Sequence, residues 1–231
     1  MSLRAIFFDL DDTLVDSTRV HARGLDAARR ALSRERSLAP TEFRRRYARA
    51  RALVKKRLGP APAARSRLLY FKAMIEDWLS RQDPALALAA SSAYERAWSA
   101  RAGASVRRLL SGLARRYTLG VLTNQMCALQ LTKLKAIDPR GRLIRILVTS
   151  EELGVEKPDR RFFAEACRRA GCRPAEALMV GDNREHDVEG GLRAGLRVAL
   201  LSPAGRAPKG VARLRRLSDL PRLLAELGEP S

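Results

Sequence analysis

Short runs of consecutive apolar residues alternate with longer amphipathic stretches along most of this chain. Residues 119–122 and 177–180 are such runs, which are typical of strands covered on both faces of a parallel sheet. Longer segments with apolar positions three and four apart predict helices between them. Strands that alternate with helices in this way predict a βαβ series. The predicted strands are residues 5–10, 117–123, 144–148, 177–181 and 197–201, and the predicted helices are residues 104–115, 126–136, 159–171, 187–194 and 218–227.

Residues 17–102 interrupt this alternation with a segment rich in Ala, Leu and Arg and nearly free of β-branched residues. Apolar positions such as Leu68, Phe71 and Ile75 recur three and four residues apart, so each helix presents one face for packing. Proline and glycine break the segment at three places. It is therefore predicted to form a small helical bundle, with helices at residues 18–37, 41–57, 63–81 and 84–101.

The two patterns together predict an α/β fold with two parts. Residues 1–16 and 103–231 are expected to form a Rossmann-like core, a doubly wound parallel sheet with helices on both faces. Residues 17–102 are expected to form an inserted all-helical domain. Hinges between the two parts are predicted near residues 16–17 and 101–104.

The composition is that of a folded protein, with 231 residues of which 46% are apolar. No stretch approaches the roughly 18 apolar residues needed to span a bilayer, and the first apolar run lacks a leader cleavage site. We therefore expect a cytoplasmic protein without membrane association. The three cysteines and two histidines match no metal-ligand spacing. The sequence leaves the oligomeric state open.

The net charge of +20 comes mostly from arginine and should attract anions. Nucleic acid is one candidate partner, and small phosphorylated or carboxylated substrates are another. A solvated, arginine-rich surface is also typical of proteins that work at high temperature. The charge alone does not choose among these interpretations.

Three carboxylates follow the first predicted strand directly, at Asp9, Asp11 and Asp12, with the hydroxyl of Thr13 beside them. Like charges this close raise one another's pKa, so such a cluster usually holds a cation or moves a proton. Side chains two apart in an extended segment share a face, so Asp9 and Asp11 are expected to point the same way. The alternative is a turn and helix cap, because Asp and Thr also accept hydrogen bonds from free backbone N–H groups.

Polar residues also follow the later strands of the predicted sheet. Thr123 and Asn124 close one strand, Asp182 and Asp187 follow another, and Lys157 lies in a loop. Ligands of open parallel sheets bind beyond the carboxyl ends of the strands. We therefore expect these side chains to meet the first acidic group at one edge of the sheet.

These four segments, in this order, resemble the motifs of the haloacid dehalogenase superfamily of phosphotransferases, and the resemblance covers most of the chain. Asp9, Asp11 and Thr13 match its first motif, Thr123 its second, Lys157 its third, and Asp182 with Asp187 its fourth. The insert after the first motif is similar to the helical cap of the first type in this family, which closes over the site and excludes water. Within the family, the chain is similar to the sialic acid 9-phosphatases and the pyrimidine-nucleotide phosphatases.

The resemblance implies an enzyme that hydrolyses a small phosphate ester through an aspartyl phosphate. Asp9 would be the nucleophile, and Asp11 would protonate the leaving alkoxide and then deprotonate water. The implied cofactor is Mg²⁺, bound by the Asp9 carboxylate, the Asp11 backbone carbonyl and Asp182.

The same resemblance implies the phosphate-binding groups, which are Thr123, the backbone amide of Asn124 and the ammonium of Lys157. Asp187 would orient Lys157 or a metal-bound water, and Thr13 would support the metal site.

Three other functions remain as alternatives. A phosphomutase would use the same first motif, and a 2-haloacid dehalogenase would keep Asp9 but lack an acid at position 11. The third is a nucleic-acid-binding protein that uses the basic segment around residues 43–57, in which arginines alternate with Phe43 and Tyr47. Charge at so many successive helical positions favours a solvated surface, so we expect a phosphate-ester substrate and no nucleic-acid partner.

Overall fold

Six parallel strands form one sheet in the order β3-β2-β1-β4-β5-β6. The computed structural model describes residues 2–34, 37–99 and 103–229. The central strand, β1, is the first in sequence, and it pairs with β2 on one side and β4 on the other. This arrangement confirms the predicted doubly wound α/β fold. The strands are β1 (Ala5–Phe8), β2 (Thr118–Thr123), β3 (Ile146–Thr149), β4 (Ala177–Gly181), β5 (Arg197–Leu201) and β6 (Ala212–Leu214).

Alternate residues of strands β1 to β5 pack into two different hydrophobic clusters, one on each face of the sheet. Ile6 and Phe8 of β1 pack with helix α5 (Ala104–Leu113) and helix α10 (Leu220–Glu226). Ala5 and Phe7 pack on the other face with helix α8 (Arg160–Ala170). Burial on both faces explains why successive residues of β1 are all apolar.

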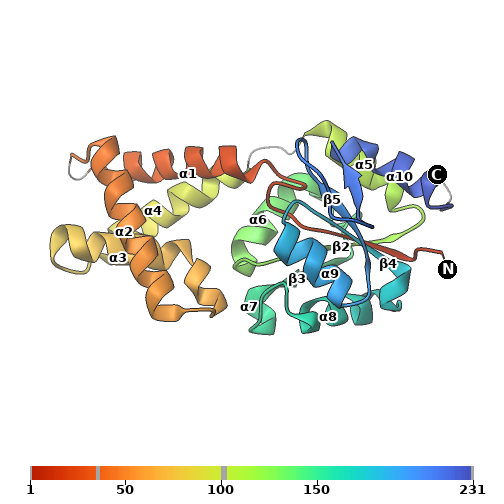
Figure 1. The fold of residues 1–231 in the computed structure, drawn as a ribbon. Coiled ribbons are helices and arrows are strands. Elements are labelled where there is room, and N and C mark those ends of the chain that lie inside the picture. Colours follow the sequence, from red (N-terminus) through yellow and green to blue (C-terminus); the bar gives the residue numbers. More distant parts are fainter. Residues whose placement is uncertain (1, 35–36, 100–102, 230–231) are drawn as a thin grey trace.

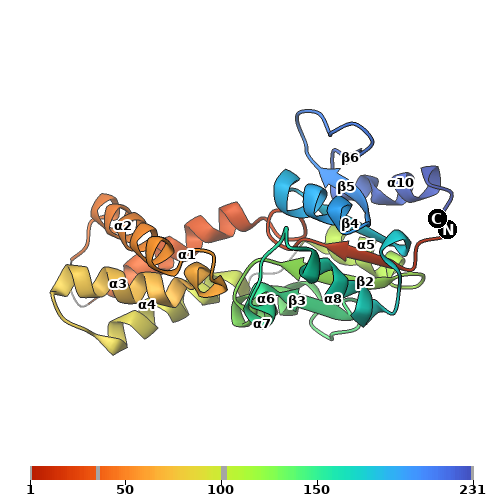
Figure 2. The same ribbon diagram turned by 60° about the horizontal axis from the view of Figure 1, so that its bottom comes forward.

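The insert forms a separate lobe with its own hydrophobic cluster (Figures 1 and 2). Phe71 and Ile75 are buried in that cluster, as the apolar periodicity predicts, whereas Leu68 is 40% exposed. Tyr70 and Tyr94 are also fully buried there. Leu129 of α6 (Cys127–Ile137), in the core lobe, joins this cluster, so α6 lies against the insert. The helices of the insert are α1 (Ser17–Leu32), α2 (Pro40–Leu58), α3 (Arg67–Leu79) and α4 (Pro84–Arg96), with single 3₁₀ turns at Pro62–Arg65 and Ala97–Ser99.

Several element boundaries differ from those predicted. The first helix of the insert ends at Leu32 rather than at residue 37, and the fourth ends at Arg96 rather than at residue 101. Strand β6 and the short helix α7 (Ser150–Leu153) were missed because each is at most four residues long. The predicted helix at residues 187–194 begins earlier, as a π-helical turn at Arg184–Glu189 followed by α9 (Gly190–Arg193). The hinge predicted near residues 101–104 lies largely outside the described residues.

The basic helix α2 does not offer a surface for stacking nucleic-acid bases. Phe43 and Tyr47, the aromatic residues between its arginines, are only 2% and 5% exposed and pack inside the insert. Base stacking needs exposed aromatic rings. Among the helices of the described residues, none combines the length and the apolar character that crossing a membrane requires.

Candidate active site

The chain turns sharply after β1 and places the first acidic group at the carboxyl edge of the sheet. The amide of Asp9 donates to the carbonyl of Val180 at 2.9 Å, which continues the pairing of β1 with β4. Asp12 adopts a positive φ of 59°, and its carboxylate accepts hydrogen bonds from the amide and hydroxyl of Thr18 at 2.9 and 3.0 Å. Asp12 therefore stabilises the first turn of α1. In this respect the turn-and-cap interpretation holds for one of the three acids.

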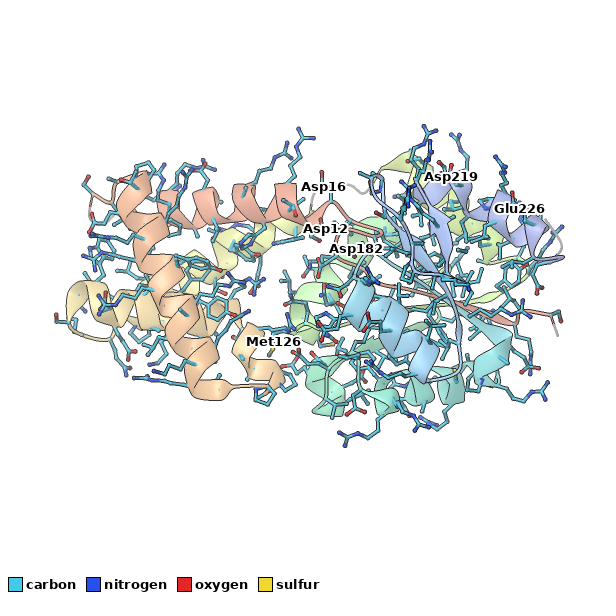
Figure 3. All side chains as sticks on the ribbon, in the orientation of Figure 1. Asp12, Asp16, Met126, Asp182, Asp219 and Glu226 are labelled. Atoms are coloured by element: carbon cyan, nitrogen blue, oxygen red, sulfur yellow. The ribbon has the colours of Figure 1, made fainter. Side chains whose placement is uncertain are left out.

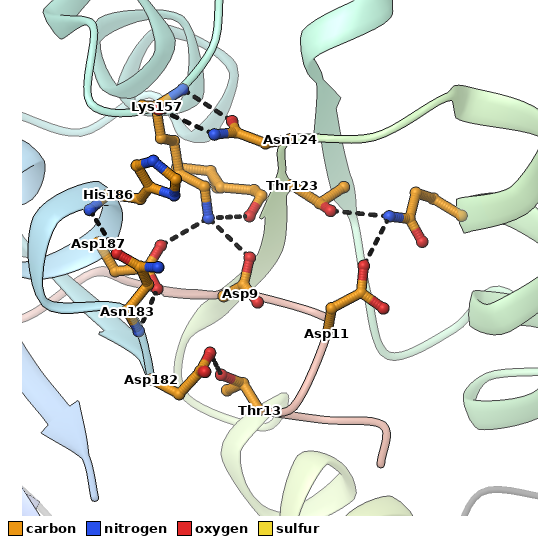
Figure 4. Close-up of polar contacts among 12 residues, drawn as sticks. Asp9, Asp11, Thr13, Thr123, Asn124, Lys157, Asp182, Asn183, His186 and Asp187 are labelled. Carbon is orange, nitrogen blue, oxygen red and sulfur yellow. Dashed lines mark hydrogen bonds and ion pairs between the residues drawn. The ribbon is translucent and has the colours of Figure 1, made fainter. Parts of the chain in front are cut away.

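Lys157 lies at the centre of the site and is only 2% exposed. Its ammonium is 2.7 Å from Oδ1 of Asp9, 2.6 Å from Oδ1 of Asp187 and 2.7 Å from the carbonyl oxygen of Leu122 (Figure 4). Burial alone would lower the pKa of Lys157, but Asp187 and Asp9 outweigh it and raise that pKa. The lysine is therefore a fixed positive charge beside the proposed nucleophile.

Thr123 is the last residue of β2 and Asn124 follows it, and both line the same site. The side chain of Asn124 hydrogen-bonds to the backbone of Lys157, donating to its carbonyl oxygen at 2.8 Å and accepting from its amide at 2.7 Å. The hydroxyl of Thr123 accepts a hydrogen bond from Nε2 of Gln130 at 2.9 Å. Asn124 thus positions Lys157, a role that the sequence analysis did not predict.

Three carboxylates form a possible metal site beside Lys157. Oxygen atoms of Asp9, Asp182 and Asp187 all lie within 4.8 Å of one another. Asp182 is held by the hydroxyl of Thr13, which donates to it at 3.1 Å. Asp12 and Asp182 both lie where the two lobes meet (Figure 3).

The electrostatics of the three carboxylates of Asp9, Asp182 and Asp187 favour a bound cation. Burial raises the pKa of Asp9 to about 8, with Lys157 opposing this shift and the charges of Asp187 and Asp11 adding to it. Burial and the charge of Asp187 also raise the pKa of Asp182. A hard divalent ion with oxygen ligands would relieve this repulsion and favour both carboxylates in their charged form. The donor set therefore fits Mg²⁺.

Asp11 points away from Lys157 and toward α6 (Figure 4). Its carboxylate forms an ion pair with Lys133 and accepts hydrogen bonds from Ser17 and, at 3.1 Å, from Gln130. Burial alone would raise the pKa of Asp11, but Lys133, Ser17 and Gln130 together outweigh burial and lower that pKa. Asp11 is therefore held as a charged carboxylate, and it does not share the partners of Asp9 although both line one cavity of about 200 Å³.

The insert reaches this cavity through Arg65, which is also one of its lining residues. Two guanidinium nitrogens of Arg65 bind the two carboxylate oxygens of Glu156 in the core, each at 2.6 Å. Such a two-point pair fixes both distance and orientation. It holds the insert over the carboxyl ends of the strands.

Every site residue predicted from the sequence lies at this edge of the sheet. The cavity is lined by Asp9, Asp11, Thr123, Asn124, Lys157, Asp182 and Asp187, and Thr13 binds Asp182. The sequence analysis missed Ser17, Gln130 and Lys133. Gln130 and Lys133 are polar residues three apart on the buried face of α6 with Ile137, and that unusual placement was the available signal.

A comparison of the sequence with models of protein families identifies the family of this chain. The family model described as haloacid dehalogenase-like hydrolase matches residues 3–195. The chain belongs to this hydrolase family. The predicted family and the predicted hydrolase class are thereby confirmed.

Individual proteins are also similar over most of the chain. Ribulose-1,5-bisphosphate 5-phosphatase of Halopiger xanaduensis is 32% identical, over 87% of this chain and 85% of that protein. Human N-acylneuraminate-9-phosphatase is 25% identical, over 97% and 95% of the two chains. The crystal structure of 2-haloacid dehalogenase from Pseudomonas syringae is 26% identical and superposes with a TM-score of 0.75, over 97% of this chain and 99% of that one. The predicted similarity to sialic acid 9-phosphatases, which act on N-acylneuraminate 9-phosphate, is thereby confirmed.

Proposed function

We propose that this hydrolase is a Mg²⁺-dependent phosphatase of small phosphorylated metabolites. The observation that supports it best is the position of Asp9, which lies 2.7 Å from the ammonium of Lys157 and within 4.8 Å of two further carboxylates. Phosphoryl transfer needs a nucleophile and positive charge around the phosphate oxygens, and both are assembled here. Two relatives that match most of the chain are named as phosphatases, which supports the same proposal.

The reaction begins at Asp9. One of its oxygens attacks phosphorus, the bond between phosphorus and the ester oxygen breaks, and the phosphoryl group remains on Asp9. Water then attacks the same phosphorus, the new P–O bond to Asp9 breaks, and inorganic phosphate leaves.

Asp11 moves the protons of both steps in this proposal. Its lowered pKa suits the second step, in which a charged carboxylate takes a proton from water. In the first step Asp11 in its protonated form gives its proton to the leaving alkoxide, and the second step restores that proton, so the two steps balance. An acid at position 11 favours an alkoxide leaving group over halide, which leaves without a proton, and so favours a phosphatase over a dehalogenase.

The phosphate oxygens are bound by three groups at the strand ends. These are the hydroxyl of Thr123, the backbone amide of Asn124 and the ammonium of Lys157. Asp187 positions Lys157, since the two groups are joined at 2.6 Å and both are buried. Fixed donors of this kind stabilise charge that grows in the transition state without having to reorganise.

Mg²⁺ would be held by Asp9, Asp182 and the backbone carbonyl of Asp11, with Thr13 orienting Asp182. When bound, it supplies positive charge that offsets the repulsion between Asp9 and the phosphate.

The test is phosphate release from a panel of phosphate esters with Mg²⁺, comparing the unaltered protein with Asp9→Asn. We expect Asp9→Asn to lower kcat by a factor of at least about 10³, because the nucleophile is lost. Asp12→Asn is the matched control, since Asp12 binds Thr18 and an asparagine still caps a helix. It should stay within a few-fold of the unaltered rate. Undiminished phosphate release by Asp9→Asn would reject the proposal.

A further inference from the structure

Arg67, at the start of α3 in the insert, is a half-buried cation without a carboxylate partner among the described residues. Its Nη1 donates to the carbonyl oxygen of Arg65 at 2.8 Å, and its Nε contacts the hydroxyl of Tyr94 at 3.4 Å. The guanidinium lies 5.5 Å from the ring centroid of Tyr70 and 6.0 Å from that of Tyr94. Partial burial of an uncompensated charge is unfavourable, so such a group usually has an anion to bind.

The side chains of Tyr47, Tyr94 and His21 lie around Arg67. The hydroxyl of Tyr47 is buried and has no hydrogen-bond partner among the described residues. Its ring lies 5.9 Å from that of Tyr70 and 6.4 Å from that of His21. Burial raises the pKa of Tyr47, against the charge of Arg67, so the hydroxyl keeps its proton and can donate. A buried donor without an acceptor is rare in native proteins and calls for a ligand.

His21 adds no negative charge to this group. Its Nδ1 lies 2.8 Å from the hydroxyl of Tyr94. Burial, together with the positive charges of Arg67, Arg51 and Lys133, lowers the pKa of His21 to about 4, against the opposing charge of Asp11. The imidazole is therefore neutral at pH 7.

The surrounding face of the insert has an excess of positive charge. The pKa of Lys55 is lowered by desolvation and then by Arg51, Arg65 and Arg67, with Glu156 the one acid that opposes them. Glu156 is already bound to Arg65 by two hydrogen bonds. The positive charges of this face are therefore not fully neutralised within the protein and can attract an anionic ligand.

This group adjoins the active site. Arg65, whose carbonyl accepts from Arg67, lines the same cavity as Asp9 and Lys157. On the other side, Lys133 binds Asp11 and lies 4.1 Å from the ring centroid of Trp98, which in turn is 6.0 Å from that of Tyr94. The charge of Arg67 also acts on Lys133, the partner of Asp11, so Arg67 lies on the side of the insert that faces the active site.

We propose that Arg67, with the hydroxyls of Tyr47 and Tyr94, binds a second anionic group of the substrate. The substrate is then a phosphate ester that bears a further carboxylate or phosphate at its distal end. The guanidinium offers paired N–H donors that match the oxygens of either group. This inference rests on the proposed phosphatase function and narrows its substrate class.

The test uses pairs of esters that differ only in the second anion. 3-Phosphoglycerate is compared with glycerol 3-phosphate for a carboxylate, and ribose 1,5-bisphosphate with ribose 5-phosphate for a second phosphate. The readout is the ratio of kcat/KM within each pair. In at least one pair, the unaltered protein should favour the ester that carries the second anion by about tenfold or more. Arg67→Met should reduce that ratio by a similar factor.

Arg44→Met is the matched control, because it removes the same charge from an exposed position of α2. It should leave the ratio unchanged. If Arg67→Met does not fold, Arg67→Lys and Tyr47→Phe decide, and each should reduce the ratio. Equal ratios in the unaltered protein and these variants, or no preference in the unaltered protein, would overturn the inference.

Calorimetric binding of the same pairs to Asp9→Asn separates this inference from the proposed function. If the ester with the second anion binds more tightly and Arg67→Met removes that preference, the anion site is supported even if no ester is hydrolysed. Hydrolysis that depends on Asp9 but proceeds equally well with and without the second anion would support the proposed phosphatase function and reject the anion site.

Discussion

The side chain of Asn124 satisfies both backbone polar groups of Lys157, 33 residues away in sequence, through hydrogen bonds of 2.8 and 2.7 Å. This contact joins the loop after β2 to the loop that precedes α8. It fixes the backbone from which the Lys157 side chain extends to Asp9 and Asp187.

Replacing Asn124 by alanine should therefore weaken both stability and catalysis. Two buried backbone groups lose their partners, which costs on the order of 1–3 kcal/mol in the free energy of unfolding. We expect kcat to fall by about tenfold or more, because Lys157 loses its fixed position. Urea unfolding and steady-state kinetics measure the two effects. A variant with normal stability and normal kcat would show that the contact has no positioning role.

Lys157→Met should be strongly destabilising, because it leaves the buried carboxylate of Asp187 without its cation. Breaking a buried ion pair in this way costs about 3–5 kcal/mol. Adding Asp187→Asn should recover part of that loss, and a double-mutant cycle of unfolding free energies measures the coupling. Simple additivity of the two substitutions would contradict the assigned ion pair.

Gly181 ends β4 where the side chain of Asp187 passes over it. A Cβ at this position would lie 2.2 Å from Oδ2 and 2.4 Å from Cγ of Asp187, and Asp187 is held in place by Lys157. Gly181→Ala should thus cost about 1–3 kcal/mol and lower kcat by displacing Asp187.

Gly112→Ala is the control for Gly181→Ala. Gly112 lies in helix α5 with no atom within 4 Å of an added Cβ, so alanine there should stabilise by about 0.5–1 kcal/mol. Thermal unfolding and phosphate release compare the two variants. Equal effects of the two substitutions would show that Asp187 is free to move.

The raised pKa of Asp9 predicts a dependence of stability on pH and on Mg²⁺. Between the ordinary value of 3.8 and the folded value of about 8, the folded protein retains a proton that the unfolded chain has released. The unfolding free energy of the metal-free protein should therefore fall as the pH rises through this window.

Mg²⁺ favours the charged form of Asp9 and should reduce that fall. Its stabilising effect on the melting temperature is expected to be larger at about pH 8 than at about pH 6. Asp182→Asn should diminish the response to Mg²⁺, whereas Asp12→Asn, outside the acidic triad, should not. A response that survives Asp182→Asn would place the ion elsewhere.

Local pattern was sufficient for much of the fold. Apolar runs such as residues 177–180 form strands because burial on both faces excludes polar side chains. The breaks at Pro40 and Pro84 begin helices because proline is tolerated in the first turn. Strand β6 was not predictable in the same way, because three residues contain too little periodicity to distinguish a strand from a loop.

The composition of the site was also predictable from the sequence, whereas the contacts within it were not. The order of Asp9, Thr123, Lys157 and Asp182 after strand ends determined which residues would meet, because parallel strands bring their carboxyl ends to one edge.

Only the tertiary structure decided how those residues divide their contacts. β1 ends at Phe8, so the strand alternation does not extend through the acidic group, and Asp9 faces Lys157 while Asp11 faces Lys133. The partners of Asp11 lie on α6, whose rotation depends on packing between the two lobes. Asp11 meets these partners across more than 100 positions of sequence, and no local pattern specifies such a contact.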